Sequence, residues 1–548
     1  MEYTKRLDEW RQNVKEEDLQ RELEALAADG TAAADAFFKE LEFGTGGLRG
    51  ILGAGTNRLN IYTVGRITRG LGAYIKSMGG ASACVCYDSR IKSDVFAKTA
   101  AAILAQGGIK VYLTRELAPT PFLSFITRHY GAAAGVMITA SHNPARYNGY
   151  KVYGSDGCQV TDGAARIISD FIAEEGYFGA EPTTFDILLS ENKIEYVPDS
   201  VESLYLDAVH GQCVTNDASG LSAVYTPLNG TGWRLVPEIL KRVGVQTVFS
   251  VPEQALPDGN FLTCPSPNPE KKEALALGLR YAAERGADIL LATDPDADRV
   301  GIAVRHNGGY VLLSGNETGV LLCDYILKNA GIQRPVVIKT IVTTDLGRKV
   351  AEERGAEVID VLTGFKYIGE KIGKLERCGQ ADRFAFGFEE SYGYLKGAYV
   401  RDKDAVVACM LICEMAAHHK KQGKTLKEEV DGLYARFGLY EHRLLGFEFG
   451  GAKGNARMRR LLSALRGDLP ERFARIQIAK TVDYLTQEEF DLPKSDVLQF
   501  DLANGNKAVI RPSGTEPQLK VYLTACQTAE KNAAFFAAAE RTLQRMFR

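Results

Sequence analysis

The sequence predicts an α/β fold in which three related α/β domains with mixed sheets precede a smaller C-terminal α+β domain. Over most of the chain, short apolar runs bounded by glycine or proline alternate with stretches of helical periodicity, which is the pattern of βα units. The last stretch differs, because short strands follow one another before a long terminal helix. A chain of 548 residues has room for three or four such domains.

The first domain is expected over residues 1–195. Residues 1–29 are rich in charge and helical in pattern, so we expect them to form a helical extension of this domain. The predicted strands are 83–87, 110–113 and 135–139, and the predicted helices are 94–106, 121–130 and 162–173.

The second domain is expected over 196–312, the third over 313–438 and the C-terminal domain over 439–548. In the second domain we predict strands at 223–227, 288–293 and 300–304 and a helix at 268–285. In the third we predict strands at 336–340, 357–361 and 384–388 and helices at 344–354, 366–375 and 404–420. The last domain has strands at 497–501, 507–511 and 520–524 and a helix at 529–546.

The composition is that of an ordinary soluble protein and argues against several kinds of partner. The 66 basic and 69 acidic side chains nearly cancel, so we expect no nucleic-acid partner. The longest apolar segment, 405–417, is interrupted by Glu414 and is shorter than the ~20 residues of a membrane span. We therefore expect a buried helix there and no membrane partner.

The ten cysteines are scattered, and their closest pairs lack the spacing of a zinc or redox site. Residues 1–29 contain no apolar signal region, so we expect a cytoplasmic protein. Five cysteines lie in apolar runs, where we expect buried thiols: Cys84, Cys86, Cys323, Cys409 and Cys413.

Three predicted strands run directly into polar loops, at 135–144, 288–299 and 384–393. In open α/β sheets, ligands gather at the carboxyl ends of strands. The three loops, one from each α/β domain, are therefore expected to meet in one cleft.

The loop after the second-domain strand carries carboxylates at alternate positions, Asp294, Asp296 and Asp298. Alternate side chains of an extended segment point the same way, so their oxygens can converge on one hard cation. Arg299 and Arg305 occupy the positions where an EF-hand requires glycine and glutamate, which excludes that motif. A solvated acidic turn is the alternative interpretation.

The first-domain loop contains Ser141, which we expect to be exposed at the end of its strand, followed by His142 and, ten residues later, Lys151. Histidine and lysine could supply proton transfer and phosphate attraction to a serine that carries a phosphoryl group. A strand-end turn would use the same residue types.

Two further loops have the composition of anion-binding segments. Residues 511–517 join a guanidinium, two hydroxyls and a glycine, although a tight β-turn is an alternative. Residues 44–50 are rich in glycine but lack dinucleotide-site spacing, and they suit either a loop near an anion or a connector. In the third domain, Glu389 and Ser391 offer polar groups to sugar hydroxyls or cap a strand end.

Taken in order, these loops resemble the α-D-phosphohexomutase family from about residue 43 to 524, through T-A-S-H-N-P, D-P-D-A-D-R, G-F-E-E-S-Y-G and R-P-S-G-T-E-P. The resemblance implies four domains around a central cleft, a phosphoserine at Ser141, and Mg²⁺ held by Asp294, Asp296, Asp298 and Ser141. It further implies catalytic roles for His142, Lys151 and Arg49. The residues that it implies for phosphosugar binding are Arg299, Gly364, Phe365, Lys366, Glu389, Ser391, Lys403, Arg511, Ser513, Gly514 and Thr515.

The implied reaction is the interconversion of glucose 1-phosphate and glucose 6-phosphate, with glucose 1,6-bisphosphate as intermediate and activator. Gly46, where the family often has serine, and Phe388, which lengthens the sugar loop, resemble the long phosphoglucomutase/phosphopentomutase branch. Pentose or mannose phosphates are alternative substrates. An aspartyl-nucleophile phosphatase using Asp294 is a distant alternative, since that motif expects threonine or valine at Asp298. The sequence leaves the oligomeric state open.

Overall fold

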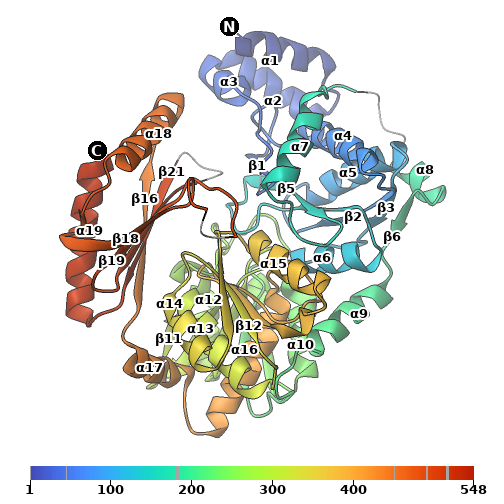
Figure 1. The fold of residues 1–548 in the computed structure, drawn as a ribbon. Helices are drawn as coiled ribbons and strands as arrows, with labels where there is room; N and C mark the ends of the chain where they lie inside the picture. The colour runs from blue at the N-terminus through green and yellow to red at the C-terminus, as the bar shows by residue number, and fades with distance from the viewer. Residues whose placement is uncertain are drawn as a thin grey trace.

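The computed structural model of the chain describes residues 2–44, 46–179, 184–449, 451–488, 491–513 and 518–547. Four β-sheets occur in four successive parts of the chain, each with helices packed beside it (Figure 1). The first three sheets mix parallel and antiparallel pairs, and the fourth is antiparallel. The predicted fold class is therefore confirmed.

The first sheet has the strand order β1-β5-β4-β2-β3-β6. Its strands are β1 (Leu48–Ile51), β2 (Ser82–Tyr87), β3 (Lys110–Leu113), β4 (Ala134–Ile138), β5 (Tyr147–Gly154) and β6 (Ile194–Tyr196). Its helices are α4 (Ile61–Ser77), α5 (Ser93–Gln106), α6 (Thr120–His129), α7 (Asp162–Ala173) and α8 (Phe185–Ser190).

The predicted N-terminal helical segment forms α1 (Glu2–Asn13) and α2 (Glu17–Ala28), followed by α3 (Gly30–Phe37). Trp10 is buried at the centre of this extension and makes edge contacts with the rings of Phe37 and Tyr62. Because Tyr62 belongs to α4, this aromatic cluster attaches the extension to the first domain.

The second sheet has the order β11-β10-β9-β7-β8, and the third has the order β13-β12-β14-β15. The second contains β7 (Ser222–Thr226), β8 (Thr247–Ser250), β9 (Ile289–Thr293), β10 (Val300–His306) and β11 (Gly309–Leu313), with α9 (Asp199–His210), α10 (Gly232–Arg242), α11 (Pro252–Ala255) and α12 (Lys272–Arg285). The third contains β12 (Val336–Thr340), β13 (Glu357–Val361), β14 (Phe384–Glu389) and β15 (Gly393–Leu395), with α13 (Gly315–Asn329), α14 (Asp345–Glu353), α15 (Phe365–Arg377), η1 (Ala381–Arg383), α16 (Ala405–Lys421) and α17 (Leu426–Phe437).

One apolar core runs through all three α/β units. It includes Phe122 of α6, Tyr225 of β7 and Phe386 of β14. The helix α16 lies inside it, with nearly every side chain buried, as expected for residues 405–417. The five cysteines predicted to be buried are all fully buried. The first three units therefore form a single packed body.

The fourth sheet has the order β16-β21-β20-β19-β18-β17 and a separate core that includes Phe500, Leu523 and Phe536. In Figure 1 it forms its own layer, with α18 and α19 on one side. Its elements are β16 (Glu441–Glu448), α18 (Gly451–Gly467), β17 (Arg472–Phe473), β18 (Ile476–Asp483), β19 (Leu498–Leu502), β20 (Lys507–Pro512), β21 (Gln518–Ala525) and α19 (Ala529–Phe547).

Two local predictions need correction. Residues 48–50, expected in a glycine-rich loop, belong to β1, which pairs antiparallel with β5. The helix expected from residue 268 begins at Lys272, because Pro267 and Pro269 hold the preceding backbone in turns. The strand β5 itself was not predicted, since its polar and glycine residues hide the strand pattern.

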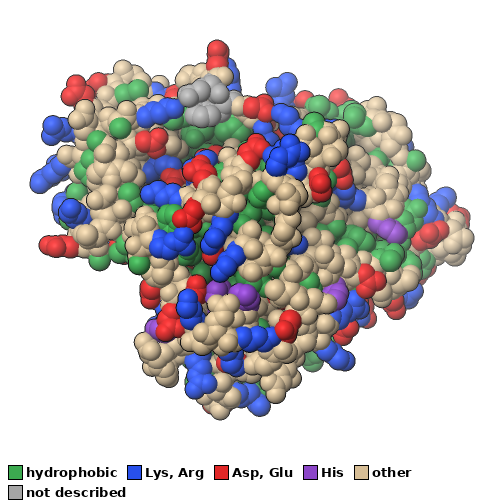
Figure 2. Space-filling view, turned by 60° about the horizontal axis from the view of Figure 1, so that its bottom comes forward, with side chains coloured by type: hydrophobic (Ala, Val, Ile, Leu, Met, Phe, Trp, Pro, Cys, Tyr) green, Lys and Arg blue, Asp and Glu red, His purple; other side chains and the backbone are tan. Residues whose placement is uncertain are grey.

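The surface agrees with the near-zero charge balance. On the face shown in Figure 2, basic and acidic side chains are interspersed. Within the described ranges, no helix combines the length and apolar character that a bilayer crossing needs.

The contact between α13 and β14 generates a stability prediction. A Cβ atom on Gly319 would lie 2.7 Å from Cε2 of Phe388, whose ring is fully buried. We expect Gly319→Ala to lower the free energy of unfolding by about 1–3 kcal/mol, because the ring has no room to withdraw. Urea denaturation measures this change.

The matched control is Gly72→Ala in α4, where the nearest atom to an added Cβ is 3.6 Å away. That change should be neutral or stabilising by up to about 1 kcal/mol. Adding Phe388→Leu to Gly319→Ala should recover part of the loss, and an equal effect of both glycine changes would contradict the packing argument.

Candidate active site

Three buried carboxylates converge directly after β9. Oxygens of Asp294, Asp296 and Asp298 all lie within 4.8 Å of one another. The loop is held by the second domain itself, because Thr231 N–H donates to the Pro295 carbonyl at 2.8 Å. The predicted convergence of these side chains is present, and it places a dense negative charge where water is excluded.

Lysines from two other domains neutralise part of this charge. Lys151 Nζ of β5 lies 2.8 Å from Asp296 Oδ2 and 3.5 Å from Asp298 Oδ2. Lys403 Nζ, between β15 and α16, lies 3.0 Å from Asp298 Oδ2. Burial would raise the pKa of Asp296, but Lys151 reverses this and holds the pKa well below its ordinary value.

The donor set fits a hard divalent cation. Asp296 Oδ1 and Asp298 Oδ1 are buried and have no hydrogen-bond partner among the described residues. Burial and the two neighbouring carboxylates raise the pKa of Asp294 well above its ordinary value, so a cation among the three would stabilise its charged form. An all-oxygen carboxylate set is what Mg²⁺ and similar ions prefer.

Ser141 lies against this triad, but it is fully buried rather than exposed as predicted. Its Oγ donates to Asp294 Oδ2 at 2.9 Å, and its backbone has φ of 52°. A non-glycine residue in this left-handed region costs about 1–3 kcal/mol. The turn carries the side chain down onto the second domain, which explains the burial.

His142 is the nearest basic side chain to that hydroxyl. Its Nδ1 lies 3.0 Å from Ser141 Oγ. Burial, together with the positive charges of Arg299 and Arg49, lowers the pKa of His142 well below its ordinary value. The imidazole is therefore neutral near pH 7, and one of its ring nitrogens has a lone pair that can accept a hydrogen bond.

The third domain contributes Glu389 at the end of β14. Its carboxylate accepts the Gly364 N–H at 2.9 Å, so the loop that precedes α15 is tied to the strand end. Phe365 is buried beside it, and Ser391 is half-buried. The ring of Phe388, expected to lengthen the sugar loop, points into the core against Gly319 and does not reach the site.

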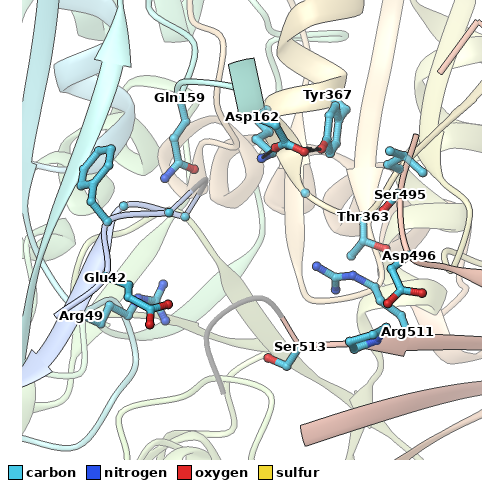
Figure 3. Close-up of a pocket in the computed structure, with 18 of the residues that line it drawn as sticks. Glu42, Arg49, Gln159, Asp162, Thr363, Tyr367, Ser495, Asp496, Arg511 and Ser513 are labelled. Carbon is cyan, nitrogen blue, oxygen red and sulfur yellow. Dashed lines mark hydrogen bonds and ion pairs between the residues drawn. The ribbon is translucent and has the colours of Figure 1, made fainter. Parts of the chain in front are cut away.

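A cavity of about 620 Å³ opens among the first, third and fourth domains. Figure 3 shows Arg49 and Arg511 on opposite sides of it, with Ser513 between them. Its cationic lining residues are Lys39, Arg49, Lys366, Arg511 and Lys520. Lys366 Nζ is 2.9 Å from Asp162 of α7, a contact between the third and first domains. Glu42, Asp162 and Asp496 also line the cavity, so five basic side chains face three acidic ones. This positive cavity can hold an anionic ligand.

Arg49 connects the cavity with the serine loop. It lines the cavity, while its Nη1 donates to Asn143 Oδ1 at 3.3 Å, two residues beyond Ser141. Arg299 lies on the other side of the triad, with Nη1 2.5 Å from Glu270 Oε1 and its backbone N–H on Asp294 Oδ1. Of the predicted C-terminal loop, Arg511 and Ser513 line the cavity, whereas Gly514 and Thr515 lie outside the described residues.

Sequence reasoning missed two residues at the site. Arg90, after β2, donates to the Ser141 carbonyl, and Thr120 Oγ1, at the start of α6, donates to Asp296 Oδ2 at 3.0 Å. Arg90 sits in a polar loop after a predicted strand, so the rule used for the other three loops would have found it. Thr120 lies in an apolar run and gives no comparable signal.

The chain matches four family models described as phosphoglucomutase/phosphomannomutase domains. Alpha/beta/alpha domain I matches residues 40–177, domain II 203–309, domain III 314–437 and the C-terminal domain 464–541. A phosphoglucomutase from Staphylococcus aureus strain MRSA252 is 36% identical over 505 residues, covering 89% of this chain and 90% of that protein.

Two solved structures share the fold. A phosphoglucomutase/phosphomannomutase family protein from Burkholderia thailandensis has a TM-score of 0.69 at 19% identity, covering 91% of this chain and 96% of that one. The N-acetylphosphoglucosamine mutase of Aspergillus fumigatus, solved with GlcNAc-6P and magnesium, has a TM-score of 0.52 at 13% identity and covers all of both chains.

The buried Glu389 generates a pH prediction. Burial, opposed by Lys403, raises the pKa of Glu389 from 4.5 to about 7. Its contribution to the free energy of unfolding is therefore present below pH 4.5 and lost as the pH rises through about 7. Between about pH 5 and about pH 8 we expect the wild type to lose ~2 kcal/mol more than Glu389→Gln.

Urea denaturation at the two pH values, without divalent cations, measures this difference. Glu273→Gln, on the exposed face of α12, is the control and should follow the wild type. Identical pH dependence in Glu389→Gln and wild type would show that the carboxyl does not titrate in this range.

Proposed function

The chain belongs to the α-D-phosphohexomutase family, that of the phosphoglucomutase/phosphomannomutase domains, and on this premise we propose that it interconverts α-D-glucose 1-phosphate and glucose 6-phosphate. The observation that carries the proposal is the contact of Ser141 Oγ with Asp294 inside the buried triad. A hydroxyl beside three convergent carboxylates is the arrangement that a metal-assisted phosphoserine carrier needs.

We propose that Asp294, Asp296 and Asp298 hold Mg²⁺, with Ser141 supplying a further oxygen. Their all-carboxylate chemistry supports this choice, and the Aspergillus fumigatus mutase was solved with magnesium. When bound, the ion supplies positive charge that stabilises the phosphoryl group in transit.

The chain's own residues would carry the transfer. The bond between phosphorus and Ser141 Oγ breaks as a bond forms to the free sugar hydroxyl, whose proton passes to a nearby base. His142, 3.0 Å from Ser141 Oγ, is a candidate for that base, and Lys151 supplies positive charge beside the triad. The bisphosphate then turns around and returns its other phosphoryl group to Ser141.

The positive cavity would hold the phosphate that does not react. Arg511 and Ser513 border it, and we assign Gly514 and Thr515 to the same loop. Gly364, Phe365, Lys366 and Lys403 would contact the substrate from the third domain, and Glu389 and Ser391 would bind sugar hydroxyls. A volume of about 620 Å³ leaves room for a hexose bisphosphate to enter in either orientation.

The phosphatase alternative has little support from the contacts of Asp294. One carboxylate oxygen accepts Ser141 Oγ–H, and the other accepts the backbone N–H groups of Asp298 and Arg299. Both oxygens are engaged, so neither is placed as a free nucleophile. A cytoplasmic location remains our proposal, in keeping with ten unpaired thiols.

Ser141→Ala tests the carrier role. We expect at least ~10³-fold loss of kcat for glucose 1-phosphate with Mg²⁺ and a trace of glucose 1,6-bisphosphate, because no other hydroxyl replaces Oγ. A coupled assay for glucose 6-phosphate measures it, with mannose 1-phosphate and ribose 1-phosphate alongside to test sugar preference.

Ser169→Ala is the matched control, since among the described residues that hydroxyl in α7 donates to the carbonyls of Phe43 and Ala165 and not to the serine loop or the triad. It should keep wild-type kcat. An active Ser141→Ala variant would reject the phosphoserine mechanism, and a wild type that prefers ribose or mannose phosphate would reject the glucose assignment.

Asp296→Asn tests the metal site. Replacing one of three carboxylates by an amide should weaken Mn²⁺ or Mg²⁺ binding at least ~10-fold, as seen by calorimetry on the protein without substrate. Asp345→Asn, a charge change at an ion pair with Lys507, is the control and should leave the affinity unchanged. Equal affinities of both variants would place the cation elsewhere.

A further inference from the structure

One buried arginine holds the loop that carries Ser141. The Arg90 guanidinium donates from Nη2 to the carbonyls of Ser141 and Asn143, and from Nη1 to those of Pro144 at 3.1 Å and Tyr147 at 2.9 Å. A single side chain therefore binds four carbonyls of this loop. A flexible ammonium cannot do this, because it lacks the planar fork that reaches several acceptors at once.

Asp88 forms an ion pair with Arg90 and holds its side chain in place. Arg90 Nε lies 3.4 Å from Asp88 Oδ2, and both side chains are fully buried. The other oxygen of Asp88 accepts Ser93 Oγ–H at 2.7 Å and the Arg90 backbone N–H at 2.9 Å. The guanidinium is thus locked in one orientation within the first domain.

The second domain also contacts the Arg90 side chain. The Arg90 guanidinium carbon lies 5.1 Å from the ring centre of Phe261, which is fully buried. The two backbones also touch, since a Cβ on Gly259 would lie 2.5 Å from Ile91 N and 2.7 Å from Ser89 O. Arg90 therefore packs between the serine loop and the second domain, which supplies the acidic triad.

The contact between Arg90 and Ser141 distinguishes Arg90 from a buried arginine that only stabilises the fold. Arg90 binds the carbonyl of the residue whose Oγ meets Asp294, and that residue has a strained φ of 52°. Arg90 is 2% exposed and does not line the 620 Å³ cavity. We therefore expect its effect on the reaction to pass through the serine loop that it holds, from Ser141 to Tyr147.

We infer that Arg90 is a positioning residue for the phosphoryl transfer: with Asp88 and Phe261 it holds Ser141 in its left-handed conformation and sets the register between the serine loop and the acidic triad. This inference rests on the proposed function. A displacement of about 1 Å at a reacting group can cost ~10²-fold in rate. A change in the position of the serine loop relative to the triad should therefore lower the rate of transfer.

The test compares Arg90→Lys with wild type in two measurements. We expect kcat to fall ~10–100-fold while KM stays within about threefold, because substrate binding does not involve Arg90. Hydrogen–deuterium exchange should become faster at the amides of Asn143 and Tyr147, whose hydrogen bonds lie inside the loop.

Arg66→Met is the matched control. Arg66 of α4 also donates to a backbone carbonyl, that of Glu175 at 2.7 Å, but it does not contact the serine loop. It should leave kcat and the loop exchange unchanged even if the unfolding temperature falls as much as in Arg90→Lys. A kcat within about threefold of wild type, or unchanged loop exchange, in folded Arg90→Lys overturns the inference.

Phe261→Leu decides the case if Arg90→Lys does not fold. This change keeps an apolar side chain but removes the ring face that lies against the guanidinium. We expect kcat to fall several-fold at constant KM, and hydrogen–deuterium exchange in the serine loop to become faster. Wild-type behaviour in both measurements overturns the inference. If wild type itself turns over no phosphosugar, the proposed function fails. Hydrogen–deuterium exchange in the serine loop of the variants then still decides whether Arg90 holds that loop.

Discussion

The arrangement of the first three domains depends on the burial of three carboxylates at the end of β9. Like charges within 4.8 Å of one another in a dry site are costly unless cations and donors surround them. Those groups come from all three domains: Lys151 and Ser141 from the first, Lys403 from the third, and the backbone N–H groups of Asp298 and Arg299 from the second itself. A shift of the first or the third domain would leave buried charge unpaired, so the triad, like the shared apolar core, ties both domains to the second.

The contacts that attach the fourth domain differ from those among the first three domains. Part of this domain forms a core of its own, whereas Val482, Tyr484, Val497 and Val509 belong to the core shared with the α/β domains. Ion pairs also join Lys507 to Asp345 and Lys371 to Asp491. The chain enters it after Gly438, which has φ of 98°. This unit carries Arg511 and Ser513 into the cavity. Placing these two residues on a domain with partly independent packing would suit the proposed reaction, because a bisphosphate must be both enclosed and turned around, and domain closure about a hinge would allow both.

Local patterns predicted the elements and the acidic loop well, and they failed where long-range pairing decides. The spacing of Asp294, Asp296 and Asp298 was readable because alternate residues of an extended segment share a side. The burial of Ser141 was not, because it requires β5 behind the loop, Arg90 beside it and the second domain beneath it. Phe388 was assigned to the sugar loop from its place in a motif, yet as the penultimate residue of β14 its ring packs into the core.

The sequence by itself determined the fold class, the family and the chemical type of each loop, since these depend on residue identity and on spacings of a few positions. Only the tertiary structure decided which loops meet. The partners Ser141 and Asp294 are 153 residues apart, and Lys151 and Asp296 are 145 apart. No local periodicity encodes such pairings. They arise because packed sheets bring their strand ends to one place, where buried charges must find counterions.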